Sequence, residues 1–216
     1  MMKLGLWLAE KGFISDILLR VAIRKLSLTR LKDKSLLSEK SKIAASFKEG
    51  PIAEQTLEAN EQHYEVPPSF FTKVLGKNLK YSCCFYETQK ETLIEAEEKM
   101  LELYLSRAEI CDGQNILDLG CGWGSFSLYA AKRFPNSVFT SISNSQDQIN
   151  FINEEAKLRG LRNIKAFKVD INDLDLEDKF DRIVSIEMFE HMRNYEKLLS
   201  KVASMLAENG KLFVHI

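Results

Sequence analysis

The stretch that decides the fold is ILDLGCGWGS, residues Ile116–Ser125. It starts as a short apolar run, typical of a buried strand, and passes at once into glycines at Gly120, Gly122 and Gly124. A strand that ends in closely spaced glycines lets a ligand approach the backbone, because no Cβ atom stands in the way. A helix after such a turn offers free N–H groups to polar or anionic ligand atoms. We therefore predict a strand, a ligand-binding turn and a helix.

Strand-like and helix-like segments alternate from this turn to the end of the chain. Such alternation predicts parallel strands joined by right-handed helical crossovers. The fold class is then α/β, with a doubly wound, mostly parallel Rossmann-like sheet in the strand order 3-2-1-4-5. The predicted strands are 115–119, 137–142, 164–169, 182–186 and 211–216, and the predicted helices are 124–134, 146–159 and 195–208.

The region before the turn has a helical pattern instead. Residues 1–50 place apolar residues at helical spacing and carry 11 Lys and Arg against 5 Asp and Glu, and a long helix is expected over 89–110. We divide the chain into a helical N-terminal extension and cofactor lid, 1–112, and a cofactor-binding Rossmann-like domain, 113–216. A basic amphipathic helix could contact a membrane surface. We favour packing on the protein's own body or on a second subunit, as in a homodimer.

The composition excludes several classes of protein. A net charge of -1, with 45% hydrophobic and 28% charged residues, is ordinary for a globular protein and gives no field that attracts nucleic acid. No apolar run reaches the roughly 18–20 residues that span a bilayer, and residues 1–13 lack the layout of a signal peptide. Because the four cysteines form no CxxC pair, we expect free thiols, no metal site and a cytoplasmic location.

The spacing of the glycines discriminates between possible cofactors. A dinucleotide site needs G-x-G-x-x-G and a P-loop needs Lys-Ser/Thr after its glycines, and neither is present here. Asp118, two residues before the first glycine, suits an ammonium group better than a pyrophosphate. S-adenosylmethionine carries an α-ammonium and a sulfonium, so we predict it as the cofactor.

Polar side chains follow the next two predicted strands. Asn144 and Gln148 stand where many nucleoside-binding folds place an acid for the ribose, and their amides can donate to and accept from hydroxyls. Asp170 supplies an acceptor for an adenine amino group, and Ile171 supplies an apolar wall. Asp170 alone is weak evidence, since Asp is common at strand ends.

Three candidate catalytic residues follow the fourth predicted strand. Glu187, Glu190 and His191 are spaced i, i+3, i+4, so a helical turn would place them on one face, beside the glycine turn. Methyl transfer from a sulfonium to an amine needs alignment in a dry pocket and a base that takes or orients the amine's proton. The alternative is an acidic first helical turn with His191 as a packing residue.

The chain resembles the cyclopropane-fatty-acid-synthase-like superfamily of class I S-adenosylmethionine-dependent methyltransferases, and within it the coclaurine N-methyltransferase type. The glycine turn identifies only the class, and the combination of motifs is more specific. The resemblance covers roughly residues 55–216 and rests on NEQHYEVPPSFF (60–71), LGKNLKYSCCFY (75–86), ILDLGCGWGS (116–125), ISNSQDQ (142–148) and SIEMFEHM (185–192).

This resemblance implies a role for each matching residue. The cofactor would be held by Tyr81 and Ser82 over its methionine end, Gly120 and Gly122 along it, Asn144 and Gln148 at the ribose, and Asp170 and Ile171 at the adenine. Glu187, Glu190 and His191 would face the substrate. His215 matches a histidine that helps to hold a bicarbonate base in the cyclopropane synthases. We expect Cys83 and Cys84 to be small buried residues beside the cofactor.

The chain stops at Ile216, inside a predicted strand, so we expect the C-terminal strands of the fold to be absent and Leu212–Ile216 to form an exposed apolar edge. We then expect cofactor binding to survive and turnover to be impaired. The leading function is N-methylation of a small amine. The alternatives are a cyclopropane-fatty-acid synthase or fatty-acyl methyltransferase acting on lipid, and an inactive cofactor-binding or scaffold fragment.

Overall fold

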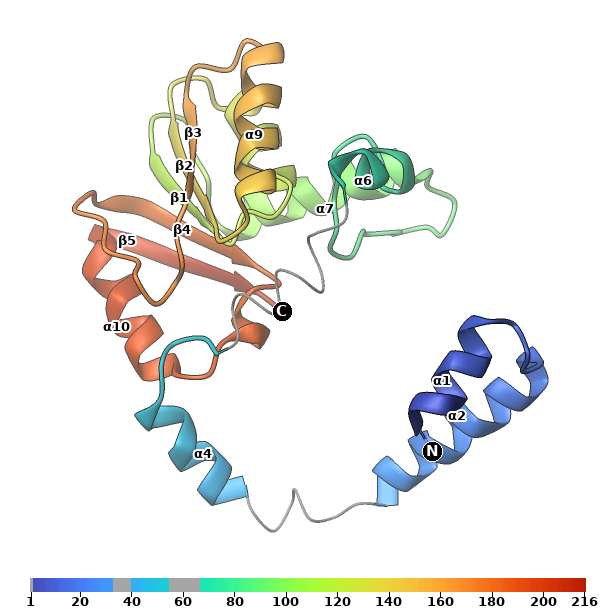
Figure 1. Cartoon of the computed structure of the whole chain (residues 1–216). Coiled ribbons are helices and arrows are strands. Elements are labelled where there is room, and N and C mark those ends of the chain that lie inside the picture. The colour runs from blue at the N-terminus through green and yellow to red at the C-terminus, as the bar shows by residue number, and fades with distance from the viewer. Residues whose placement is uncertain (1, 33–39, 55–66) are drawn as a thin grey trace. The chain divides into compact units, whose positions relative to one another are not determined.

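The computed structural model describes residues 2–32, 40–54 and 67–216 (Figure 1). His63 and the first residues of the motif at 60–71 lie outside the described residues. The chain forms two compact units, Met1–Ser46 and Phe47–Ile216. The functional division that we predict at residue 112 lies elsewhere in the chain and stays a prediction.

The first unit is helical, as expected. It contains α1 (Met2–Glu10) and α2 (Asp16–Lys32), while α4 (Lys40–Glu49) crosses into the second unit. No residue of α2 is buried, and apolar side chains such as Ile17 and Leu31 are exposed. Among the described residues, no helix is both long and apolar enough to cross a membrane.

The second unit is built on a five-stranded parallel sheet in the order β3-β2-β1-β4-β5. The strands are β1 (Asn115–Leu119), β2 (Val138–Ser143), β3 (Ile164–Lys168), β4 (Phe180–Ile186) and β5 (Leu206–His215). The predicted fold class and strand order are confirmed. Because β1 lies at the centre, its carboxyl end opens where the strand order reverses, which is the usual ligand position in such sheets.

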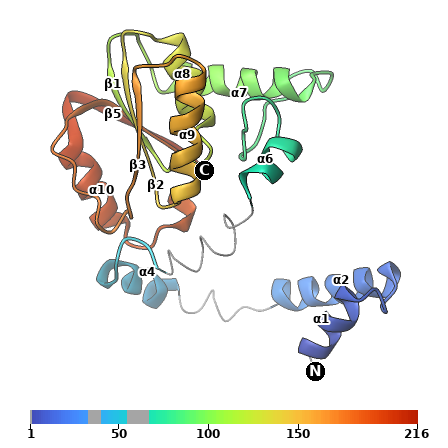
Figure 2. The ribbon, with the colours of Figure 1, turned by 45° about the horizontal axis from the view of Figure 1, so that its top comes forward.

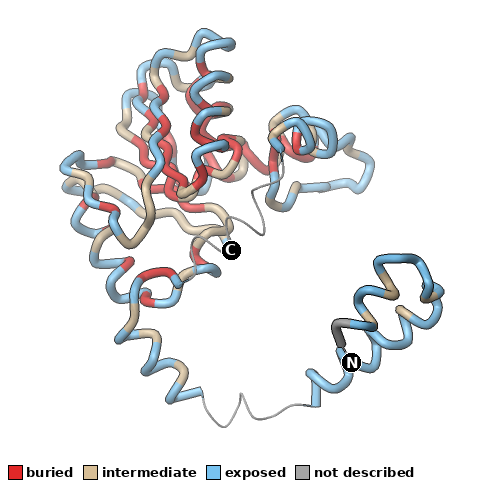
Figure 3. The backbone as a smooth tube through the Cα atoms, in the orientation of Figure 1, coloured by how far each residue is buried: buried red, intermediate tan, exposed pale blue. Residues whose placement is uncertain are grey.

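Helices cover both faces of this sheet (Figure 2). One buried cluster joins the sheet to α7 (Leu93–Arg107), α8 (Ser125–Arg133) and α9 (Gln146–Leu158), and a second joins it to α10 (Tyr195–Met205). Figure 3 shows that the buried residues are concentrated along the central strands and α9. The helices packed on the two faces of the sheet fix the carboxyl ends of the strands. They therefore also fix the start of the loops that follow the strands.

The last helix and strand differ from the prediction. Helix α10 ends at Met205 rather than at residue 208, and β5 begins at Leu206 rather than at residue 211. Leu206 continues the apolar helical spacing of Val202, so periodicity alone did not reveal the change. The left-handed Asn209 (φ 68°) and an irregular register opposite Phe180 accompany the early start of the strand. The expected exposed apolar edge at Leu212–Ile216 is found only in part: Leu212 to His215 are half-buried, and Ile216 is exposed.

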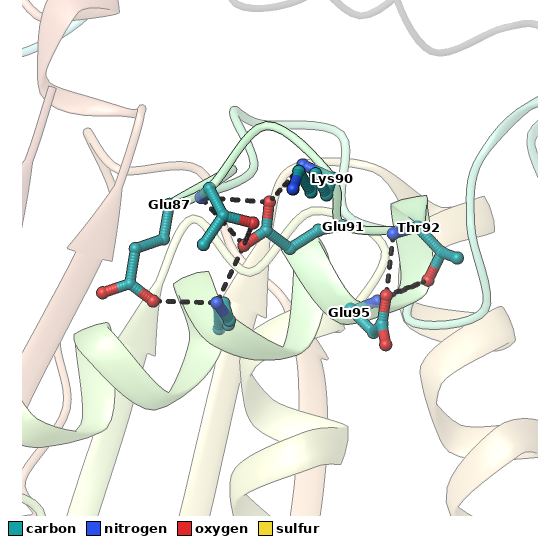
Figure 4. Close-up of polar contacts among 7 residues, drawn as sticks. Glu87, Lys90, Glu91, Thr92 and Glu95 are labelled. Atoms are coloured by element: carbon teal, nitrogen blue, oxygen red, sulfur yellow. Dashed lines mark hydrogen bonds and ion pairs between the residues drawn. The ribbon is translucent and has the colours of Figure 1, made fainter.

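Helix α7 begins later than the predicted residue 89. Gln89 has a left-handed backbone (φ 61°), and the helix is capped by Thr92, which accepts from the Glu95 N–H while the Glu95 carboxylate accepts from the Thr92 N–H at 2.8 Å (Figure 4). The loop before the cap is held by Glu91, which pairs with Lys99 at 2.8 Å. This capping box fixes the point where the chain enters α7.

Candidate active site

Backbone hydrogen bonds join the glycine turn after β1 to β2. Gly120 and Gly122 are left-handed (φ 87° and 52°), and the N–H groups of Gly120 and Cys121 donate to the Ile142 carbonyl at 3.0 and 2.9 Å. A Cβ on Gly120 would lie 2.7 Å from the Met188 side chain, whereas a Cβ on Gly122 would meet no atom within 4 Å. The first glycine is therefore required by packing, and the second faces open space.

Gly122 is among the residues that line a cavity of about 180 Å³ at the carboxyl end of β1. Its walls come from the segment 79–82, from α7, from the turn after β1 and from the residues after β4. Eight of the predicted site residues line it: Tyr81, Ser82, Asp118, Gly120, Gly122, Glu187, Glu190 and His191. The fold thus brings the predicted cofactor turn and the predicted catalytic residues to one cavity.

Asp118 is the acid at the base of the turn. It is 2% exposed, and its carboxylate accepts a hydrogen bond from the Ser127 hydroxyl, which accepts in turn from Ser141 at 2.7 Å. Burial raises the pKa of Asp118 to about 7, against which the bond from Ser127 acts. A ligand ammonium beside it would favour the ionised carboxylate.

Three buried polar atoms have no hydrogen-bond partner within the described part of the chain: Trp123 Nε1, Ser125 Oγ and Gln148 Nε2. Such atoms are rare in folded proteins, because an unpaired buried donor or acceptor costs about 1–3 kcal/mol. Trp123 and Ser125 line the cavity. A polar ligand in the cavity would form hydrogen bonds with Trp123 Nε1 and Ser125 Oγ, so these residues fit a nucleoside-bearing cofactor.

The four residues predicted to hold the ribose and adenine do not line this cavity. Asn144 and Gln148 follow β2, and Gln148 Oε1 accepts from the Ser143 hydroxyl at 2.6 Å. Asp170 follows β3 and accepts from the Asn172 N–H at 2.8 Å. Ile171 packs on the cluster beneath α10. They lie at the carboxyl ends of neighbouring strands, and their role stays a prediction.

The acidic end of the cavity is formed directly after β4. Glu187 is left-handed (φ 51°), and its N–H donates to the His215 carbonyl at 2.8 Å, which ties this corner to β5. The next turn is the 3₁₀ helix η1 (Phe189–His191). Glu190 and His191 are exposed at the mouth, and Glu187 is half-buried. This turn includes Glu190 and His191 but not Glu187, so the expected helical arrangement of all three residues does not form.

Sequence reasoning missed Lys80, which is 5% exposed and lines the cavity. Its ammonium donates to the Tyr104 hydroxyl at 3.1 Å and to the Ser82 hydroxyl. Burial lowers the pKa of Lys80, and the nearby Cys83 acts in the opposite direction. A lysine just before Tyr81 could have been noticed in the sequence, but nothing there indicated that its ammonium would be buried.

Glu97 of α7 was missed as well, and it holds the segment that forms one wall. It is fully buried, and its carboxylate accepts from the N–H groups of Asn78 and Lys80 at 3.0 and 3.4 Å. A Cβ on Gly76 would lie 2.5 Å from this carboxylate, so only glycine fits there. The segment of Leu79 to Ser82 is thus anchored from beneath.

The two cysteines beside this wall do not match the expectation. Cys83 is exposed and Cys84 is half-buried, and neither lines the cavity. Cys83 instead contacts the residues after β4 and the end of β5: its N–H donates to Glu187 Oε1 at 3.4 Å, and its Sγ lies 3.5 Å from His215 Nε2.

The family model described as mycolic acid cyclopropane synthetase matches residues 53–216. The chain belongs to this family. Within it, the chain is 45% identical to an (S)-coclaurine N-methyltransferase of Thalictrum flavum subsp. glaucum over 169 residues, which are 78% of this chain and 47% of that protein. The chain spans about half the length of the curated relatives it matches.

Solved structures of the family agree with the fold. A coclaurine N-methyltransferase bound to N-methylheliamine and SAH is 36% identical, with a TM-score of 0.89 over 99% of this chain and 64% of that one. A mycolic acid cyclopropane synthase complexed with SAH and CTAB is 26% identical, with a TM-score of 0.68 over 76% of this chain and 57% of that one.

Proposed function

We propose that the protein is an S-adenosylmethionine-dependent methyltransferase that methylates the nitrogen of a small amine. The observation that carries the proposal is the cavity itself, which is lined both by the glycine turn and by Glu187, Glu190 and His191. The N-methyltransferases among the relatives, including the one whose structure holds SAH, support this choice.

The cofactor would be held by backbone and by a few polar groups. Gly120 and Gly122 would line its methionine end, Asp118 would face its ammonium, and Tyr81 and Ser82 would cover it. Asn144 and Gln148 would hold the ribose, and Asp170 with Ile171 would hold the adenine. We assign this task to residues 113–216, with the segment before them as the lid.

The acidic end would prepare the acceptor. When bound, S-adenosylmethionine supplies a methyl group on a cationic sulfur. Glu187 and Glu190 attract a protonated amine and stabilise the ammonium product through their negative charge. His191, at the mouth, takes the proton that the amine must lose before its lone pair can attack. The walls hold the two reactants in line and exclude water.

The alternative acceptor is a lipid acyl chain, as for a cyclopropane-fatty-acid synthase or fatty-acyl methyltransferase. A cyclopropane-fatty-acyl-phospholipid synthase among the relatives, 30% identical over 158 residues, supports it. A cofactor-binding fragment without turnover is the remaining possibility. We place the protein in the cytoplasm on the basis of its free cysteines.

Cofactor carrying a labelled methyl group separates these functions when it is offered to the 216-residue chain with coclaurine or with phospholipid vesicles. We expect label in the amine, and about 100-fold less with His191→Gln, which removes the proposed base. Label only in lipid would replace the amine proposal. Binding of S-adenosylhomocysteine in calorimetry, without methyl transfer to either acceptor, would support the third alternative, cofactor binding without turnover.

A further inference from the structure

A buried cation and a buried acid line the same cavity. Lys80 comes from the segment before α7 and Asp118 from β1, and both are buried. Within residues 2–32, 40–54 and 67–216, neither of them forms an ion pair. Burial lowers the pKa of Lys80 and raises the pKa of Asp118 to about 7, so both charges are disfavoured where they lie. Each group therefore favours a ligand that brings the opposite charge into the cavity.

Contacts within the chain fix the position of the Lys80 ammonium. The backbone N–H of Lys80 donates to Glu97 Oε1 at 3.4 Å, and the ammonium donates to the Tyr104 hydroxyl at 3.1 Å and to the Ser82 hydroxyl. These two hydroxyls use two of the three ammonium protons, so one proton remains for a ligand. The Ser82 hydroxyl accepts from the lysine and keeps a proton that it can donate. Lys80 and Ser82 can thus offer two donors to one anionic group.

A zwitterion fits this pair of opposite charges. The methionine end of S-adenosylmethionine carries an ammonium and a carboxylate on the same carbon atom, and the proposed function places the ammonium against Asp118. We propose that Lys80, together with Ser82, binds the cofactor's carboxylate, so that the cavity recognises the amino acid end of the cofactor by both of its charges. This assignment rests on the proposed function and adds a cofactor-binding residue to it.

The assignment makes the carboxylate a requirement for tight binding. A ligand that lacks this group leaves the Lys80 ammonium without a partner, and its own ammonium then adds a second positive charge to the cavity. A charge-assisted hydrogen bond in a buried site accounts for about a 10- to 100-fold difference in affinity. We therefore expect the chain to bind S-adenosylhomocysteine about 10- to 100-fold more tightly than its decarboxylated analogue, which keeps the ammonium.

Calorimetry on the 216-residue chain with these two ligands tests the assignment without any methyl transfer. Lys80→Met removes the charge at similar side-chain length. It should weaken binding of S-adenosylhomocysteine about 10- to 100-fold and binding of the decarboxylated analogue less than twofold, so that the preference disappears. Lys80→Arg, which keeps the charge, should restore part of the preference. Lys77→Met, exposed on the same segment, is the matched control and should keep the full preference.

Two results would overturn the assignment. The first is equal affinity of the wild type for the two ligands, which needs no variant and so holds even if Lys80→Met does not fold. The second is equal weakening of both ligands in Lys80→Met, which would give Lys80 a purely structural role beside the cavity. Absence of binding of either ligand to the wild type would overturn the proposed function together with the assignment, and it is distinguishable from equal binding of both.

Discussion

The cavity has two walls that are built in different ways. The glycine wall (Asp118–Gly124) is made by consecutive residues that turn directly from β1 into α8, and it is tied to β2 by backbone hydrogen bonds. The lid wall (Leu79–Ser82) has no regular structure and is held by the carboxylate of Glu97 from a helix further along the chain. The residues of the glycine wall form one short sequence motif, whereas the position of the lid wall depends on the side chain of Glu97.

The largest effect is expected from filling the glycine wall. Gly122→Val places a branched side chain in the open space beside the turn, so we expect S-adenosylhomocysteine affinity to fall more than 100-fold in calorimetry. Gly160→Val is the matched control, because Gly160 is also left-handed (φ 67°) with no atom near its Cβ. It should suffer similar backbone strain, about 1–2 kcal/mol, and bind normally. If both variants bound S-adenosylhomocysteine with equal affinity, the cofactor would not lie against the glycine wall.

A smaller loss is expected from releasing the lid wall. Glu97→Ala leaves the buried N–H group of Lys80 without its acceptor, at about 1–3 kcal/mol, and also the half-buried N–H group of Asn78. We expect about tenfold weaker binding of S-adenosylhomocysteine and faster amide exchange across 76–82. Glu97→Gln, which keeps one acceptor oxygen, should restore part of both. Glu98→Ala, one residue along the same helix, is the control. An equal loss of affinity in Glu98→Ala would show that Glu97 does not specifically hold the lid wall.

A dependence on pH distinguishes the acid of the glycine wall. Because burial raises the pKa of Asp118 from 3.8 to about 7, its contribution to stability is complete below about pH 4 and is lost as pH rises through about 7. A ligand ammonium favours the ionised form, so affinity for S-adenosylhomocysteine should rise up to tenfold per unit between about pH 6 and 7. Asp118→Asn should flatten both profiles. An unchanged slope in that variant would mean that another group titrates.

The smallest effect concerns the entry to α7, next to the lid. Thr92→Ala removes half of the capping box and should lower the free energy of unfolding by about 1 kcal/mol, with less than a twofold change in affinity. Ser106→Ala, exposed at the other end of the helix, should change neither. A large loss of affinity in Thr92→Ala alone would show that the cap, rather than Glu97, positions the lid wall.

The same contrast explains what the sequence could reveal. The strand order and the glycine wall follow from local patterns, because alternating strands and helices have few permitted arrangements. The anchor at Glu97 and the burial of Lys80 depend on contacts that no local pattern records. The early start of β5 at Leu206 was hidden because that residue also fits a helical period.

The grouping of side chains after β4 lies between these two cases. Glu187, Glu190 and His191 line one cavity because they follow β4, not because they share a helical turn, and their catalytic role stays a prediction. The approach of Cys83 to His215 joins the lid to the edge of the sheet, and only the folded chain reveals it.

The central claim is that a sulfonium nucleoside occupies the cavity between the glycine wall and the lid wall. A crystal structure of the chain with S-adenosylhomocysteine tests it most directly. We expect its amino acid end between Gly122 and Tyr81, with its ammonium toward Asp118 and its sulfur toward Glu187. Ligand bound elsewhere, or a cavity closed by the chain's own side chains under saturating ligand, would contradict the account.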